Sequence, residues 1–189
     1  DWIAGGFWDY IDAGDPREEL NIEPRPTDMD RKGYDEYVTF VNYYIHQVNL
    51  LRHLLGESYK VTYADPSGVL LVAQSASGIA ATIEMSPYQT TIDWQESALV
   101  AFERGFVKLE LPAPVAVNRP GRVEVLNDPG NGTTPEKTVP HLPWVHAMRR
   151  QAENFIAAVR GEHSPMCDAA EALEDLRIAR DYLRLWKHI

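Results

Sequence analysis

The fold is decided by the stretch Val41-Asn-Tyr-Tyr-Ile-His-Gln-Val-Asn-Leu-Leu-Arg-His-Leu-Leu-Gly56, whose pattern predicts one helix that ends at a glycine. Four apolar residues recur at helical spacing and predict a buried stripe: Tyr44, Val48, Leu51 and Leu55. Four neutral polar residues form a line roughly opposite that stripe: Asn42, His46, Asn49 and His53. The line contains no Lys or Glu, the residues that usually fill a solvated face. It therefore indicates either the wall of a cleft or an ordinary polar face that lacks those residues.

The residues after this helix predict about six short strands, because apolar and β-branched residues alternate with polar ones between turn sequences. The expected strands cover residues 61–64, 69–75, 79–85, 94–102, 106–111 and 122–126. Adjacent hairpins across 76–78 and around 103–105 imply a mostly antiparallel sheet. The segment 127–141 is rich in Gly, Pro, Thr and Asn and predicts a mobile surface loop.

Two helices are predicted to close the chain. Pro143 suits the first turn of a helix that runs to about Arg160 and stops at Gly161. Asp168 is a suitable N-cap for the last helix, and Glu171 completes a capping-box pair with it. The buried stripe of the last helix is predicted to contain Leu173, Leu176, Leu183 and Trp186. The fold class is therefore α+β: an open, mostly antiparallel sheet of about six strands with helices packed on one face.

Composition restricts the function classes. The chain has 189 residues, which is enough for one hydrophobic core but short for two domains. Its 44% hydrophobic and 24% charged residues are typical of a globular protein. A net charge of -10 argues against nucleic acid and anionic membranes as partners. The single Cys167 cannot form an internal disulfide, so a reducing cytoplasm is the expected compartment. No apolar run approaches the ~20 residues that span a bilayer.

Two segments carry a resemblance to a known family. His46, followed by Asn49-Leu50-x-Arg52 and Leu54-Leu-Gly56, resembles the signature helix that opens the C-terminal domain of the Gfo/Idh/MocA oxidoreductases. Residues 155–161 and 164–179 are similar to the two closing helices of the same domain. The resemblance covers most of residues 38–188 and implies a fold like the C-terminal domain of glyceraldehyde-3-phosphate dehydrogenase. It also implies that the domain binds substrate and forms oligomers.

The cofactor half of that family is missing from this sequence. The chain contains no Gly-x-Gly-x-x-Gly turn, and Glu136-Lys137 is followed by Thr138 rather than by the proline of the family's Glu-Lys-Pro motif. We therefore interpret residues 1–37 as an irregular segment that follows a missing Rossmann domain, and residues 38–189 as the substrate-binding and oligomerisation domain. NAD or NADP is expected to bind mainly to the missing domain.

The resemblance also suggests site residues. In the family an Asp-x-x-x-His pair on the signature helix positions the substrate hydroxyl beside the lysine of Glu-Lys-Pro. Here His46 matches the histidine, whereas Asn42 occupies the aspartate position. Asn cannot stabilise an imidazolium as a carboxylate does. Either His46 only orients substrate and the missing lysine takes the proton, or the activity differs or is lost.

His46 and Asn42 are accordingly predicted to be catalytic, and Asn49 and Tyr43 to bind substrate. Tyr44 belongs to the apolar stripe, so core packing is its expected role. Weaker candidates for the cleft are Glu84 and Gln89.

Other chemistry finds little support in the sequence. No metal site is expected, because the pairs His141/His146 and His163/Cys167 lack further ligands at suitable spacing. Cys167 is interpreted as structural. The acidic residues Glu171, Glu174 and Asp175 are interpreted as a solvated helix face. Near the N-terminus there is an aromatic cluster that contains Trp2, Phe7, Trp8 and Tyr10. It is expected to pack under the sheet, to pack on the missing domain or to reach the substrate cleft.

The resulting functional hypothesis is the C-terminal half of an oxidoreductase that transfers a hydride between NAD(P) and a sugar, polyol or inositol-like hydroxyl compound. Its expected partners are this small substrate, its own Rossmann domain and, through the open sheet face, copies of itself in a homodimer or tetramer. The isolated chain is predicted to have no turnover. The alternative is a non-catalytic ligand-binding or co-regulator module of the same fold, and a hydrolase that uses bound NAD transiently ranks below both.

Overall fold

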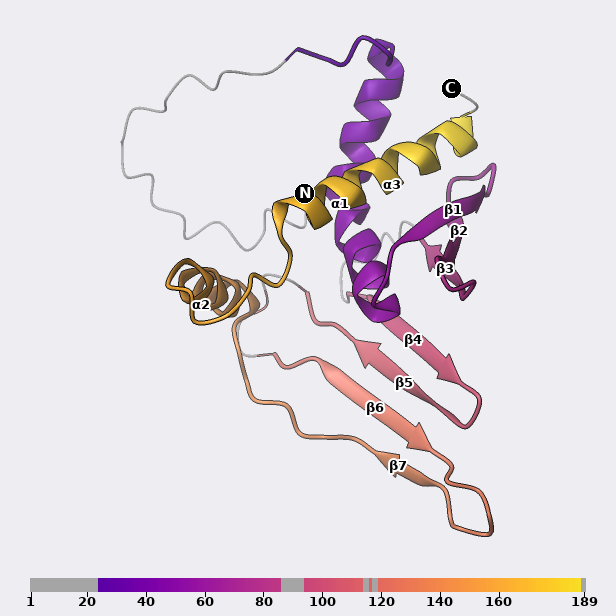
Figure 1. Cartoon of the computed structure of the whole chain (residues 1–189), viewed down its shortest axis with the longest axis vertical. Helices are drawn as coiled ribbons and strands as arrows, with labels where there is room; N and C mark the ends of the chain where they lie inside the picture. The colour runs from indigo at the N-terminus through magenta and orange to yellow at the C-terminus, as the bar shows by residue number, and fades with distance from the viewer. Residues whose placement is uncertain (1–23, 86–93, 114–115, 117–118, 188–189) are drawn as a thin grey trace. The chain divides into compact units, whose positions relative to one another are not determined.

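The computed structural model describes residues 24–85, 94–113, 116 and 119–187 (Figure 1). The chain divides into two compact units, each described here by itself. The described part of the first unit comprises residues 24–85 and 167–187, and that of the second comprises residues within 94–166. The N-terminal aromatic cluster and Gln89 lie outside the described residues.

The first unit begins with α1, Arg31–Leu55, which contains the predicted helix and ends as expected at Gly56 in the left-handed conformation. The helix begins earlier than predicted, because Asp30 caps it by accepting a hydrogen bond from the backbone N–H of Gly33 at 2.6 Å. Tyr37 and Phe40 extend the apolar stripe in the N-terminal direction. Residues 31–37, which were predicted to be irregular, are therefore helical.

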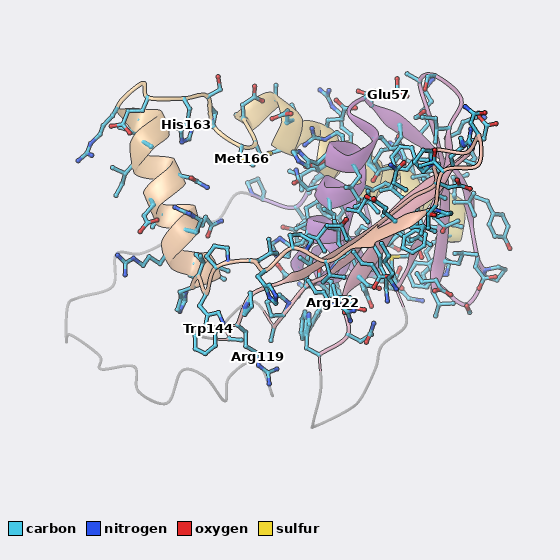
Figure 2. The ribbon with its side chains drawn as sticks, turned by 90° about the horizontal axis from the view of Figure 1, so that it is seen from below. Glu57, Arg119, Arg122, Trp144, His163 and Met166 are labelled. Carbon is cyan, nitrogen blue, oxygen red and sulfur yellow. The ribbon has the colours of Figure 1, made fainter. Side chains whose placement is uncertain are left out.

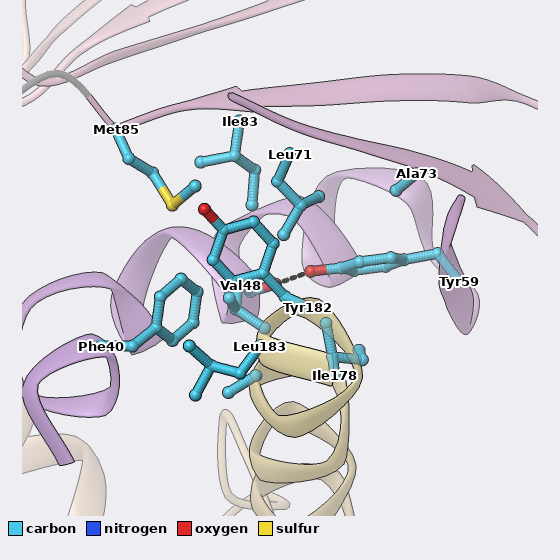
Figure 3. Packing of buried hydrophobic residues seen from close by; sticks show 11 residues of the cluster. Phe40, Val48, Tyr59, Leu71, Ala73, Ile83, Met85, Ile178, Tyr182 and Leu183 are labelled. Carbon is cyan, nitrogen blue, oxygen red and sulfur yellow. Dashed lines mark hydrogen bonds between the residues drawn. The ribbon is translucent and has the colours of Figure 1, made fainter. Parts of the chain in front are cut away.

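Three antiparallel strands in the order β1-β2-β3 form the sheet of the first unit. They are β1 Tyr59–Ala64, β2 Leu70–Ser75 and β3 Ala80–Glu84, as the hairpin pattern predicts. Side chains from this sheet, α1 and the last helix form the core shown in Figure 3, in which the Tyr59 hydroxyl donates to the backbone carbonyl of Val48 at 3.1 Å. Val48 and Leu71 are fully buried at its centre.

The last helix, α3 Ala169–Lys187, begins with the predicted capping box. The Asp168 carboxylate accepts from the backbone N–H of Glu171, and the Glu171 carboxylate accepts from the backbone N–H of Asp168, both at 2.9 Å. The buried stripe, however, consists of Asp175, Ile178, Ala179, Tyr182 and Leu183. Leu173 is exposed, so the predicted stripe was wrong at its N-terminal end. The buried face of the helix there lies about half a turn from Leu173, on the side of Asp175.

The second unit contains a four-stranded antiparallel sheet in the order β4-β5-β6-β7. The strands are β4 Ser97–Phe102, β5 Gly105–Glu110, β6 Arg122–Asn127 and β7 Glu136–Thr138. The short β7 lies within the segment predicted to be only a loop. Its sequence, Glu-Lys-Thr, lacks apolar alternation, and it forms a strand by pairing with the edge of β6.

Cross-strand register gives the two faces of this sheet different chemistry. One face is apolar and carries Ala98, Val100, Phe102, Val107, Leu109, Val123 and Val125. The other carries a ladder of paired charges: Lys108, Glu110, Arg122, Glu124 and Lys137. None of the described strand residues on the apolar face is fully buried.

The helix of the second unit, α2, comprises Ala147–Val159. It begins after Pro143 rather than at it, because His146 caps the first turn by accepting from the backbone N–H of Arg149. The helix ends as predicted before Gly161.

The predicted class, α+β with mostly antiparallel open sheets, is confirmed. The strand arrangement differs, because seven described strands form two sheets instead of about six strands in one. The expectation of helices on one sheet face holds in the first unit, where α1 and α3 contact the strands.

Candidate functional site

The candidate site is the polar row on α1. Asn42, His46 and His53 are exposed on one line of the helix: Asn42 and His46 are one turn apart, and His53 follows two turns later. The opposite side of α1 is fixed in the core through Val48 and Phe40. A rigid helix thus presents these neutral side chains outward.

Asn42 and His46 lie one helical turn apart, which places their Cβ atoms about 5–6 Å from each other. Within the part of the chain that the structure describes, neither side chain has a hydrogen-bond or ion-pair partner. An imidazole and a carboxamide at this separation can donate to or accept from the same small hydroxylated molecule. The two side chains are therefore available for a ligand.

Tyr43 and Tyr44 have different environments although they are adjacent. Tyr43 is 59% exposed, whereas Tyr44 packs against the core and its hydroxyl donates to the carbonyl of Met85 at 3.0 Å. Burial and the neighbouring Tyr43 raise the pKa of Tyr44. The predicted packing role of Tyr44 is confirmed, and Tyr43 faces solvent beside the row.

Asn49 belongs to the same line in the sequence but its side chain is bound within the protein. Its Nδ2 donates to Oδ2 of Asp175 at 2.7 Å and lies 3.5 Å from the Sγ of Cys167. The donor of this carboxamide is therefore already used, and the structure does not place Asn49 with the freely exposed pair Asn42 and His46.

A buried charge network joins α1 to α3, and the sequence analysis missed it. The Nε of Arg52 donates to Asp175 at 2.8 Å and its Nη1 donates to Glu171 at 2.9 Å. The side chains of Arg52 and Asp175 are 11% and 3% exposed. The interpretation of Asp175 as part of a solvated face was wrong, because it lies at i-3, i-4 and i-7 from the buried residues Ile178, Ala179 and Tyr182. That spacing was the available signal.

Cys167 is exposed and lies at the N-terminal end of α3. Its Sγ is 3.9 Å from Nη2 of Arg52. Glu84, the other candidate for the cleft, is exposed at the end of β3. Within the described ranges no group of three or more His, Cys, Asp or Glu side chains is placed to hold a metal ion.

A dinucleotide cofactor of the Rossmann type needs a parallel strand–helix–strand unit with a glycine-rich turn. Every strand pair in the described residues is antiparallel, and the chain has no Gly-x-Gly-x-x-Gly sequence. The described residues therefore do not fit a site of that type. Among the described helices, none has both the length and the apolar character needed to cross a membrane.

Comparisons with solved structures identify the fold. One match is a protein from Desulfitobacterium hafniense assigned as an NADPH-dependent oxidoreductase, with a TM-score of 0.59 and 13% identity over 79% of this chain and 46% of that chain. Another is KijD10, a 3-ketoreductase from Actinomadura kijaniata in complex with NADP. It matches with a TM-score of 0.52 and 12% identity over 79% of this chain and 46% of that chain. A mutant of the same ketoreductase, in complex with TDP-benzene and NADP, matches with a TM-score of 0.51 and 12% identity over 76% and 45%.

The chain spans about half the length of these solved proteins. The match shows a shared fold over about half of each of these oxidoreductases, which agrees with the fold that the sequence resemblance implied. No family model matches the sequence, and no curated protein matches it.

Proposed function

We propose that this chain is the substrate-binding half of an NAD(P)-dependent oxidoreductase that acts on a sugar, polyol or inositol-like hydroxyl compound. The observation that carries the proposal is the fold shared with about half of two oxidoreductases, one of them solved with NADP. The exposed pair Asn42 and His46 supports it, because the pair occupies the positions at which the resemblance implies substrate contacts.

The residues of this chain would bind and orient the substrate. His46 would hold and orient a substrate hydroxyl through one ring nitrogen, beside the group that takes the proton. Asn42, one turn away, would donate to or accept from the same hydroxyl group, and Tyr43 would contact the substrate from the side of the row. The nicotinamide cofactor supplies or accepts the hydride when bound.

The cofactor would be held mainly by a Rossmann domain elsewhere in the protein, because the described residues do not fit a dinucleotide site. That domain would also determine the choice between NAD and NADP and supply a lysine for proton transfer. We accordingly expect no turnover from the isolated chain, and the cytoplasm as the compartment of the whole protein.

Assembly through the four-stranded sheet is part of the proposal. Its apolar face carries seven apolar residues, none fully buried, and Phe102 is among the exposed large hydrophobics. A continuous apolar sheet face of this kind favours contact with another protein surface. The same face of a second copy would cover it in a homodimer or tetramer.

A ligand-binding module without chemistry is the second candidate, and Asn42 is the observation that favours it. A carboxylate at this position would stabilise a protonated His46, whereas a carboxamide cannot. A protein that only senses a hydroxylated ligand has no need of that charge.

The test compares His46→Ala with His53→Ala in the protein that contains both halves. Both histidines are exposed on the same line of α1, so both variants should fold equally well. We expect His46→Ala to lower kcat by about 100-fold or more, and His53→Ala to lower it by less than about threefold.

Steady-state assays with NAD(H) and NADP(H) and a panel of sugars, polyols and the corresponding ketones provide the measurement. Equal losses in the two variants would contradict the assignment of His46. A parent protein that binds a sugar without any turnover, and loses that binding in His46→Ala, would instead establish the ligand-binding module.

A further inference from the structure

His46 is the shared neighbour of two different side chains on α1. Asn42 lies four residues before it and Tyr43 three residues before it, and these are the two spacings at which side chains meet on a helix surface. A helical side chain also leans back over the turn that precedes it, so the imidazole leans toward Asn42 and Tyr43. All three side chains belong to one helix, so this arrangement depends on nothing outside α1.

The ring of Tyr43 is not part of the core of the first unit. Tyr44 packs against that core, and its ring centre lies 5.6 Å from that of Phe40. The ring centre of Tyr43 lies 6.4 Å from that of Tyr44, with 51° between the ring planes. Tyr43 itself is 59% exposed. Tyr44 thus supports the Tyr43 ring, most of whose surface the described residues of the first unit leave uncovered.

The part of α1 around these side chains carries no fixed charge. Residues 37–51 contain no Asp, Glu, Lys or Arg. Glu36 and Arg52, which flank this run, are both ion-paired within the first unit. Glu57, the next carboxylate along the chain (Figure 2), accepts a hydrogen bond from the backbone N–H of Ser77 at 3.1 Å. This part of the helix therefore offers groups that bind hydroxyls and an aromatic ring, without a fixed charge to pair with a phosphate or a carboxylate.

We propose that the Tyr43 ring stacks on the face of a cyclic, uncharged substrate, a pyranose or a cyclitol. Such a molecule has C–H bonds on its faces and hydroxyl groups around its edge. The electron-rich face of an aromatic ring attracts the C–H groups, and stacking removes apolar surface from water. The imidazole of His46 and the carboxamide of Asn42 can bind hydroxyls at the edge of the same molecule. An open-chain polyol offers no such face.

This inference rests on the proposed function and narrows its substrate class. It also separates the roles of two neighbouring residues. A ring that stacks equally well on the ground state and the transition state contributes uniform binding, so its loss raises KM and leaves kcat almost unchanged. The loss of His46, which holds the reacting hydroxyl, lowers kcat instead.

The test uses the protein that contains both halves, with three variants. Tyr43→Phe keeps the ring, whereas Tyr43→Leu keeps the apolar character and removes the flat ring. Tyr63→Leu is the matched control, because Tyr63 is another exposed tyrosine of the first unit and lies on β1. The probes are glucose, myo-inositol and sorbitol. The last two have the same number of carbon atoms and hydroxyl groups, and they differ mainly in ring closure.

We expect kcat/KM for the better cyclic probe to exceed that for sorbitol by about tenfold or more. Tyr43→Leu should raise KM for that probe by about tenfold and change kcat by less than about twofold. Tyr43→Phe and Tyr63→Leu should change both constants by less than about threefold. Saturation-transfer NMR gives a measurement without turnover. Irradiation of the aromatic protons should saturate C–H protons of the bound cyclic probe, and this transfer should fall in Tyr43→Leu but not in Tyr63→Leu.

Three outcomes would overturn the inference. A preference for sorbitol over both cyclic probes would show that the site does not select a ring. An unchanged KM in Tyr43→Leu would show that the ring does not contact substrate, as when another part of the protein covers it. A loss of kcat as large as in His46→Ala would give Tyr43 a role other than stacking.

These outcomes differ from a failure of the proposed function, because each of them includes turnover. A complete protein without turnover would contradict the proposed function alone. The NMR measurement would then decide about Tyr43, and an equal transfer in the unmodified protein and Tyr43→Leu would overturn the inference.

Discussion

At the scale of single residues, the side chains along α1 differ in their roles although they follow one helical line. Asn42 and His46 are exposed, whereas Asn49 binds Asp175. The difference arises because α3 lies against the flank of α1 that carries Asn49 and Arg52. The candidate site therefore consists of Asn42 and His46, whereas Asn49 on the same line helps to hold the two helices together.

The first residue-scale prediction concerns this buried network. Asp175→Ala should lower the free energy of unfolding by about 3–5 kcal/mol, because it leaves the guanidinium of Arg52 without its buried partner. Asp181→Ala on the same helix should lower it by less than about 1 kcal/mol, because Asp181 is 61% exposed in its ion pair with Arg184. Urea unfolding at pH 7 measures both values.

Comparable small losses in both variants would contradict the structural role of Asp175. Asp175→Asn is a useful third variant, because it keeps the shape of the side chain and removes only its charge. We expect its loss of stability to lie between the other two.

The second residue-scale prediction concerns alkaline pH. Burial raises the pKa of Tyr182 to about 12, so the folded protein retains a proton that the unfolded chain loses near pH 10. The stabilisation from this group is fully present below pH 10 and is lost as the pH rises toward 12. The free energy of unfolding should therefore fall over that range by up to about 1.4 kcal/mol per pH unit for this proton.

Urea unfolding at a series of pH values between 9 and 12 measures this slope, with Tyr182→Phe as the control. The variant lacks the titrating hydroxyl and should show a shallower slope. It also loses the hydrogen bond from the hydroxyl to the carbonyl of Gly68, which costs about 1 kcal/mol at every pH below 10. Identical slopes for the two proteins would contradict the prediction.

At the scale of elements, α3 holds the turn between β1 and β2. Besides the hydroxyl of Tyr182, the indole Nε1 of Trp186 donates to the carbonyl of Pro66 at 3.1 Å. Gly68 lies in the left-handed region with φ of 77°, and a Cβ added there would overlap with the Trp186 ring. The position of α3 against this turn therefore requires a residue without a side chain at position 68.

Gly68→Ala and Gly78→Ala form a matched pair that tests this dependence. Both glycines have positive φ, and each alanine should cost about 1 kcal/mol of backbone strain. Only Gly68→Ala also displaces the Trp186 ring, because nothing lies within 4 Å of a Cβ at Gly78. We expect Gly68→Ala to lower the free energy of unfolding by at least about 1 kcal/mol more than Gly78→Ala, as measured by urea unfolding. Equal losses in the two variants would contradict the contact between Gly68 and the Trp186 ring.

The sequence predicted elements best where a local chemical signal marked them. The end of α1 at Gly56, the capping box at Asp168 and the paired strands were all predictable from caps, turns and alternation. The start of α2 was misplaced because Pro143 offered a competing start signal. Strand β7 was missed because its three polar residues form a strand only through pairing with β6.

The same limit applies to the candidate site. The exposure of Asn42 and His46 followed from helical periodicity, which depends on one element alone. The binding of Asn49 and Arg52 to Asp175 joins residues more than 120 positions apart, and periodicity within α1 contains no information about them. The buried position of Asp175 in α3 was the one local sign of that contact.

At the scale of the whole molecule, the chain has the fold of about half of a larger oxidoreductase. Its described residues include an exposed polar row and an apolar sheet face, but not a dinucleotide fold. These features together fit a part that binds substrate and contacts other protein surfaces. The cofactor chemistry would come from the rest of the protein.

The central claim is tested most directly by comparing the protein encoded by the complete reading frame with this chain alone. Both are assayed by absorbance at the nicotinamide band with NAD(H) and NADP(H) and a panel of hydroxylated and ketone substrates. The account predicts turnover by the complete protein and none by the chain alone. Turnover by the chain alone, or a complete protein that binds a sugar but reduces or oxidises neither cofactor, would contradict it.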